Sequence, residues 1–135
     1  MQTTGILSPE REDEVTDLAA EVGPAAQVVV RETAKAMEFD REEYDERVST
    51  DVVLTARDAL FASLLEVHVG TSEEFEEWAD EFDGEVVETG NENVDNVVWH
   101  AFDGTAVAAT FQDEEDAAVA TLRRQAFGRL YDDLV

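Results

Sequence analysis

The sequence contains no cysteine, and Lys35 is its single lysine. The lack of cysteine excludes disulfide bonds, thiolate zinc sites and a cysteine nucleophile. Lysine and arginine together number only nine in 135 residues. A typical nucleic-acid-binding protein needs a basic surface that displaces phosphate counterions, so we expect no nucleic-acid partner.

Long apolar runs are also missing. The first residues, "MQTTGILSPERED", have neither the basic segment nor the apolar stretch of a secretory signal peptide. No run of 18 apolar residues occurs, so we expect no membrane-spanning helix and no membrane partner. These absences favour a cytoplasmic protein.

Acidic residues are abundant instead. The 34 aspartates and glutamates give a formal net charge of −25, and they spread from Glu10 to Asp133. The whole surface is therefore expected to be acidic. Because 44% of the residues are apolar, the chain has enough material for a core, and we expect one folded domain over residues 1–135.

The N-terminal half shows apolar residues at helical spacing. Gly23–Pro24 is expected to end a first helix and to open a second, since proline is favoured at the first helical position. In the second helix Val28, Val29, Ala36 and Met37 are expected to face inward. Shorter helices are predicted from Asp40 and from Thr50, where capping residues stand.

Residues 63–69 alternate in polarity. Leu65, Val67 and Val69 fall on one side, which predicts a strand. Continuation of the preceding helix through this stretch is the alternative. A helix is then predicted after the Gly70–Thr71 turn, a position where anions often bind. Thr71 and Glu74 have capping-box spacing, however, so the carboxylate of Glu74 is expected to occupy the amides that a phosphate needs.

The loop "GNENVDN" contains Asn91, Asn93 and Asp95, which invite a calcium interpretation. The EF-hand pattern fails, because Asn96 replaces the required glycine and Phe102 the final acid. Local turns formed by the Asn and Asp side chains explain the composition. We expect no metal site and no cofactor.

Residues 113–135 are predicted to form one long helix. Its buried stripe comprises Val119, Leu122, Ala126, Leu130 and Leu134. Arg123, Arg124 and Arg129 are expected to pair with carboxylates. Phe127 and Tyr131 widen the apolar arc, which suggests self-association through this helix or through the sheet.

The stretch "VVWHAFDGTAVAATF" predicts a hairpin. A two-residue turn at Asp103–Gly104 would pair His100 with Val107 and Val98 with Ala109. Both faces of this hairpin are then apolar, so both must be covered, by helices of the same chain or by another copy.

His100 lies among aliphatic residues in this hairpin and is expected to be a buried, neutral histidine with a hydrogen-bond partner. The alternative uses both histidines. If residues 63–69 lie beside the hairpin, His68 and His100 would converge with Glu66 nearby, as candidate catalytic or metal-binding groups.

The order of elements predicts an α+β fold: N-terminal helices, then a strand-helix-three-strand antiparallel sheet unit closed by a long C-terminal helix. The dense, lysine-poor acidity resembles that of cytosolic proteins from halophilic archaea. Three segments carry a further resemblance, to an uncharacterised family of small acidic haloarchaeal proteins: "GPAAQVVVRETAKAMEFDREEYDERV", "ENVDNVVWHAFDGTAVAATF" and "LRRQAFGRLY". That family has no assigned activity, so the resemblance implies source and compartment but no functional residue.

Two classes of function follow. The first is a non-enzymatic protein-interaction or assembly module, acting on a protein partner or on a second copy of itself. The alternative is a small-ligand or metal-binding enzyme that uses His68 and His100. The two classes differ in whether the two imidazoles share a pocket that solvent can reach.

Overall fold

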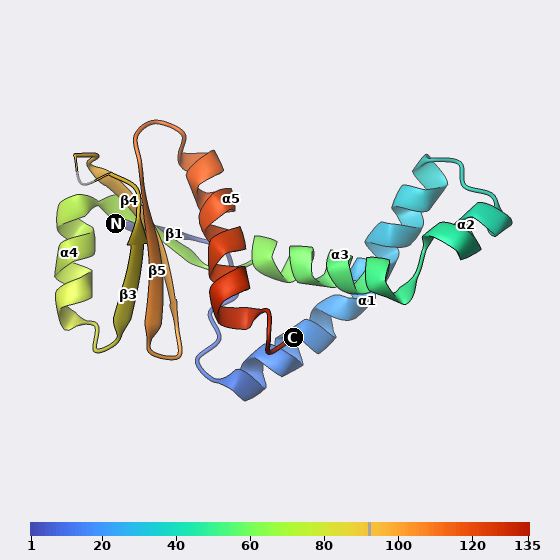
Figure 1. Cartoon of the computed structure of the whole chain (residues 1–135), viewed down its shortest axis with the longest axis horizontal. Helices are drawn as coiled ribbons and strands as arrows, with labels where there is room; N and C mark the ends of the chain where they lie inside the picture. The colour runs from blue at the N-terminus through green and yellow to red at the C-terminus, as the bar shows by residue number, and fades with distance from the viewer. Residues whose placement is uncertain (92) are drawn as a thin grey trace.

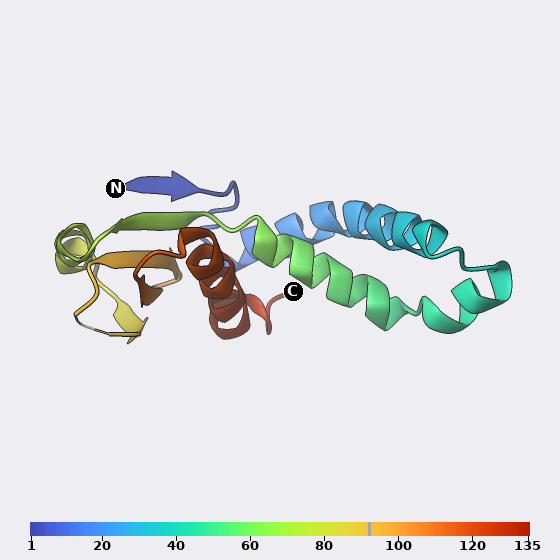
Figure 2. The ribbon, with the colours of Figure 1, turned by 90° about the horizontal axis from the view of Figure 1, so that it is seen from above.

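The computed structural model describes residues 1–91 and 93–135. A five-stranded sheet carries helices on both faces, and a helical arm extends from it (Figures 1 and 2). This is the expected α+β fold. The elements are β1 (Gln2–Thr4), α1 (Glu12–Ala36), α2 (Arg41–Arg47), α3 (Thr50–Ser63), β2 (Val67–Thr71), α4 (Ser72–Glu81), β3 (Glu85–Thr89), β4 (Asn96–Phe102), β5 (Thr105–Phe111), α5 (Glu115–Ala126) and a π-helical turn, η1 (Phe127–Tyr131).

The strands lie in the order β1-β2-β4-β5-β3, and all neighbours are antiparallel except β3 and β5. The predicted hairpin register is confirmed, with His100 opposite Val107. Asp103 and Gly104 both have positive φ, 49° and 80°, which is the backbone of a tight hairpin turn. The strand at β3 was expected as part of an antiparallel unit, but it pairs in parallel with β5, so the fully antiparallel arrangement is wrong. The N-terminal β1 was not predicted, because its partner β2 is distant in sequence.

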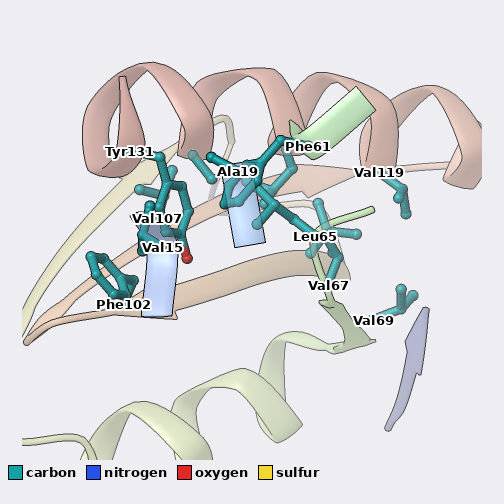
Figure 3. Packing of buried hydrophobic residues seen from close by; sticks show 13 residues of the cluster. Val15, Ala19, Phe61, Leu65, Val67, Val69, Phe102, Val107, Val119 and Tyr131 are labelled. Atoms are coloured by element: carbon teal, nitrogen blue, oxygen red, sulfur yellow. The ribbon is translucent and has the colours of Figure 1, made fainter. Parts of the chain in front are cut away.

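Helices of the same chain cover both faces of the sheet, as Figure 1 shows. One face packs against α5, the start of α1 and the end of α3, and Figure 3 shows this core around Phe61 and Tyr131. The other face packs against α4, where Phe75 meets Val97 and Trp99. The expectation that both faces of the hairpin are covered is therefore confirmed.

Helix α1 runs unbroken through Pro24, so the predicted break at Gly23–Pro24 is wrong. Its buried residues are Val15, Ala19, Ala26 and Ala34. These positions continue one stripe across the proline. Proline has no backbone N–H, so one helical hydrogen bond is missing at Pro24. The buried stripe packs on both sides of this position, and that packing maintains the helix.

The predicted inward face of this segment is also wrong. Val28, Val29 and Met37 are 49%, 47% and 59% exposed, and Ala36 is exposed as well. The helix buries its alanines and turns its larger apolar side chains outward. Apolar periodicity alone does not identify which of two apolar stripes meets the core.

The strand predicted at 63–69 is confirmed only in part, because α3 continues to Ser63 and β2 begins at Val67. The N–H groups of Ile6 and Leu7 both donate to the Leu64 carbonyl, at 2.9 and 2.8 Å. The chain between α3 and β2 is thus held by the N-terminal segment. The predicted sides are nevertheless correct, since Leu65, Val67 and Val69 are buried.

The C-terminal segment is not one α-helix. Helix α5 ends at Ala126 and continues as the π-helical turn η1. Val119, Leu122 and Ala126 are buried as predicted, but the next fully buried residue is Tyr131, five positions after Ala126. The wider π turn accounts for that spacing, and Leu130 is left only half-buried.

Candidate functional site

His100 lies on β4 and is buried against η1, with 2% of its surface exposed. Its Nδ1 lies 2.5 Å from the Glu66 carbonyl oxygen and its Nε2 2.5 Å from the Tyr131 hydroxyl. A carbonyl oxygen only accepts, so Nδ1 carries the proton, and the neutral ring then accepts the Tyr131 O–H at Nε2. Both ring nitrogens are satisfied.

Burial lowers the pKa of His100, and its hydrogen bond to the Glu66 carbonyl opposes that shift. Burial likewise raises the pKa of Tyr131. The pair is therefore neutral near pH 7. The expected buried, neutral, hydrogen-bonded histidine is confirmed.

Tyr131 is the partner that sequence reasoning missed. In an uninterrupted helix Tyr131 falls beside the stripe of Leu122 and Ala126, and only the π turn brings it to the core. The sequence did contain one signal for this contact, namely a tyrosine beside an apolar helical stripe together with a histidine expected in the core. A buried tyrosine hydroxyl usually has a hydrogen-bond partner.

His68 lies on the opposite face of the sheet. It stands across from Trp99 in the β2–β4 pairing, and their rings stack with centroids 5.4 Å apart. Burial lowers the pKa of His68. Its Nδ1 and the Nε1 of Trp99 are buried without a hydrogen-bond partner among the described residues.

The two histidines therefore do not converge, although β2 and β4 are neighbours as the alternative required. Glu66 approaches His100 through its backbone carbonyl and not through its carboxylate. Neither histidine lines the surface hollow between Met1, Glu74 and Glu115. In residues 1–91 and 93–135, no group of three or more His, Asp or Glu side chains is placed to hold a metal ion.

The anion position before α4 is occupied as predicted. The Thr71 hydroxyl accepts the Glu74 N–H at 3.1 Å, and the Glu74 carboxylate accepts the Thr71 N–H at 3.0 Å. The amino group of Met1 also pairs with Glu74. In the preceding loop, the Asn93 N–H donates to Asn91 Oδ1 at 2.9 Å, which confirms a local turn there; Glu92 lies outside the described residues.

The predicted pairing of the C-terminal arginines with carboxylates is wrong for the described residues. Arg123 donates to the carbonyl oxygens of Leu65 and Thr4, at 2.9 and 3.2 Å, and so ties α5 to the N-terminal segment. Arg124 donates to the Thr121 hydroxyl. None of the ion pairs found in the described chain involves Arg123, Arg124 or Arg129.

The surfaces named for self-association are not free. Tyr131 is fully buried, and the half-buried Phe127 packs edge-on against Phe61 at 5.9 Å. The wide apolar arc of the C-terminal segment thus completes the core of the same chain. Both faces of the sheet are also covered from within the chain.

Exposed apolar side chains gather instead on the helical arm, which we define as residues 22–60. Among the described residues, seven large apolar side chains are exposed, and only Met1 and Ile6 lie outside the arm. The other five are Val28, Val29, Met37, Val52 and Leu54. Figures 1 and 2 show the arm projecting beyond α5, away from the sheet, with α2 at its far end.

Comparison with family models gives a match to the family of unknown function DUF5809 over residues 6–132. The chain belongs to this family. Comparisons with curated proteins and with solved structures each found no match. In the part of the chain that the structure describes, no helix has both the length and the apolarity needed to cross a membrane. Membership in the family assigns no activity, so function has to be inferred from the chain's own surfaces.

Proposed function

We propose that this protein is a non-enzymatic protein-interaction or assembly module, and that the helical arm is its binding element. The observation that carries the proposal is the concentration of exposed apolar side chains on the arm. Large apolar groups exposed together on one part of a soluble protein mark interaction surfaces. Scattered single residues would need no such explanation.

The distribution of charge supports the same proposal. The arm contains nine acids and five bases, whereas the remaining 96 residues contain 25 acids and four bases. The arm therefore has a net charge of −4 over 39 residues, about half the negative charge per residue of the remaining 96, whose net charge is −21. The cores of protein interfaces contain few charged residues, because burying an unpaired charge is costly. The lower charge of the arm therefore suits a binding surface.

Catalysis by the histidine pair has no comparable support. His100 is buried with both ring nitrogens engaged, and His68 stacks on Trp99 across the sheet. A general base must reach the proton that it abstracts, and metal ligands must share one site. This geometry favours an interaction module over catalysis by His68, His100 and Glu66.

The setting that we propose is the cytoplasm of a halophilic, haloarchaeal cell, for a chain that folds as one unit without nucleic-acid or membrane partners. The net charge of −25 carries this part of the proposal. At about 1 M salt the Debye length is about 3 Å, so repulsion among surface acids is largely screened. Melting in about 0.1 M and about 3 M KCl tests it: the midpoint should rise with salt, and an equal or lower midpoint at 3 M would contradict a halophilic protein.

The interaction proposal is tested by affinity capture at about 2 M KCl, from an extract of the cells that produce the protein, where the Debye length is near about 2 Å. Wild type is compared with Val29→Glu on the arm and with Ile6→Glu, a matched change of an exposed apolar residue outside the arm. Association should be lost in Val29→Glu and kept in Ile6→Glu. Equal capture by all three forms would remove the arm as the binding element.

A further inference from the structure

The arm carries a small hollow at its tip, where α1 ends and α2 begins; Figures 1 and 2 show this junction at the far end of the arm. Its volume is about 240 Å³. The buried or half-buried side chains of Ala34, Phe39 and Tyr44 form its floor, and the exposed side chains of Arg31, Lys35 and Arg41 form its rim. The lining is mainly apolar, so the rim residues contribute chiefly their aliphatic stems. We call this feature the tip hollow.

Local backbone geometry fixes the floor. After α1 the chain turns at Glu38, whose φ of 57° is usual for glycine at the end of a helix and costly for other residues. The N–H of Phe39 donates to the Ala34 carbonyl, and the N–H of Glu38 donates to the Lys35 carbonyl, both at 3.0 Å. This turn brings Phe39 back to the last turn of α1. The guanidinium carbon of Arg47 lies 5.3 Å from the centroid of the Phe39 ring and holds it from the side of α2.

The rim concentrates positive charge on an acidic protein. Three of the nine basic residues of the chain line this one hollow. Arg31 and Arg41 take part in none of the ion pairs found in the described chain, and Lys35 has only an exposed pair with Glu32 at 3.4 Å. The one acid in the lining, Asp40, caps α2 by accepting a backbone N–H at 2.8 Å. The rim therefore has cations available for the anions of a partner.

The size and lining of the tip hollow limit what can bind there. Small-molecule sites usually enclose about 300–1,000 Å³, so a hollow of about 240 Å³ is small for such a ligand and suits one large apolar side chain. An apolar floor within a rim of cations matches an apolar group that has carboxylates beside it. Protein interfaces are commonly built in this way, from an apolar anchor in a pocket with polar groups around it.

We propose that the tip hollow binds an acidic segment of a partner protein, which inserts one apolar side chain between carboxylates that contact the rim. This rests on the proposed function and supplies the chemistry of the partner. Charge complementarity carries the proposal, because three bases and one acid line the hollow on a chain of net charge −25.

Molar salt places the carboxylates close to the anchor. At about 1 M salt the Debye length is about 3 Å, so an acid that is merely near the rim is screened. A carboxylate in direct contact with a guanidinium keeps its attraction, and arginine can hold it through two parallel hydrogen bonds. The acids of the partner are therefore expected next to the apolar residue in sequence.

Single-stranded nucleic acid is the other anionic polymer that aromatic and basic side chains bind together. The surroundings of the tip hollow disfavour it. Residues 38–46 contain six acids and one base, so a phosphate backbone that extends beyond the rim would be repelled. A short acidic segment needs anions only at the rim itself.

The test is heteronuclear NMR of the full chain in about 1 M KCl, titrated with the peptide acetyl-Asp-Asp-Leu-Asp-Asp-amide. The backbone amide signals of Ala34, Phe39 and Tyr44 should shift and saturate. Glycine in place of the peptide's leucine should weaken binding about tenfold or more, because the apolar anchor is lost. A peptide with lysine in place of every aspartate should give no saturable shift.

Variants of the rim test the role of its charge. Arg31→Gln and Arg41→Gln change exposed side chains, so both should fold as wild type. Each should weaken binding of the acidic peptide about two- to fivefold, the usual effect of one exposed ion pair, and the double variant should weaken it further. Arg124→Gln is the matched control, because Arg124 is an exposed arginine on α5, outside the arm, and it should bind as wild type.

Four results would overturn the proposal: no saturable shift with the acidic peptide, equal binding of the lysine peptide, unchanged affinity in the Arg31→Gln/Arg41→Gln variant, or the same signals shifting with oligothymidylate instead. Affinity capture separates this proposal from the proposed function. Capture lost in Val29→Glu but kept in the double rim variant would leave the arm as the binding element and reject the tip hollow. Capture kept in both would reject the two proposals together, and capture lost in both would support them.

Discussion

In the sheet body the largest fully buried side chains are Trp99, Tyr131, Phe61, Leu65 and Leu122, whereas the arm buries mainly alanines, Ala26 and Ala34. The body is covered by helices on both faces and is surrounded by acids. The arm is a pair of crossing helices capped by α2, and it leaves its valines outside. The body therefore completes its own core, and the arm does not.

This difference separates two tasks in one chain. Burial of large side chains provides most of the free energy of folding, so substitutions in the body should act on stability. The arm contributes little buried apolar surface, so substitutions on its exposed side should act on association. Matched substitutions in the body and on the arm test that division.

Phe61→Ala should cost about 3–5 kcal/mol, the usual range for removal of a buried aromatic ring. Phe61 is fully buried, and its ring meets that of Tyr131 at 5.4 Å and that of Phe127 at 5.9 Å. Denaturant unfolding in about 2 M KCl measures the change. The arm control is Val28→Ala, which should lie within about 0.5 kcal/mol of wild type because Val28 is half exposed. A similar loss of stability in Phe61→Ala and Val28→Ala would contradict the proposal that the body provides stability and the arm provides binding.

His100→Leu should cost about 1–3 kcal/mol, because it leaves the Tyr131 hydroxyl and the Glu66 carbonyl without their partner in a buried site. The double variant His100→Leu/Tyr131→Phe should recover part of that loss, since it removes the stranded hydroxyl. Equilibrium unfolding of His100→Leu, of Tyr131→Phe and of the double variant gives the coupling between the two residues. Independent, additive effects would show that the hydrogen bond does not contribute.

Local chemistry explains what the sequence predicted correctly. Thr71 and Glu74 satisfy one another within four residues, and Asp103–Gly104 fixes the hairpin register within two. The burial of His100 followed from that register. Each of these features depends on neighbours in sequence, so spacing alone determines it.

The features that were missed depend on distant contacts. Helix α1 continues through Pro24 because of its packing on α3. The expected strand β3 pairs in parallel with β5, twenty residues further along the chain, and not in the antiparallel arrangement that was predicted. Tyr131 reaches His100 only through the π turn. The exposure of Val28 and Val29 was missed for another reason: an apolar stripe looks the same whether its partner belongs to the same chain or to another.

Pro24→Ala should stabilise the protein by about 2 kcal/mol. Alanine restores a backbone donor inside α1, and a proline in a helix interior costs about 3 kcal/mol relative to alanine, of which about 1 is offset because proline also restricts the unfolded chain. Thermal melting measures the change. A neutral or destabilising result would show that the chain does not form a continuous helix at Gly23–Pro24.

The smallest expected effect is on the pH dependence of stability. Burial holds the pKa of His100 below its ordinary value of 6.5. As the pH falls through that value, the unfolded chain takes up a proton that the folded chain does not. The contribution of neutral His100 is therefore complete above about pH 6.5 and declines below it, until the folded pKa is reached. One such proton changes the free energy of unfolding by at most about 1.4 kcal/mol per pH unit.

Unfolding in urea between about pH 7 and pH 5.5 separates this effect from the carboxylates, most of which titrate below that range. The free energy of unfolding of wild type should fall across the interval, and that of His100→Gln should fall less, because the glutamine amide does not titrate. His68→Gln is the control on the other face of the sheet: the pKa of His68 is also lowered by burial, but its ring is half-buried, so its removal should flatten the profile less. A larger flattening in His68→Gln than in His100→Gln would mean that the pH sensitivity of the body lies under α4 and not in the core that Tyr131 completes.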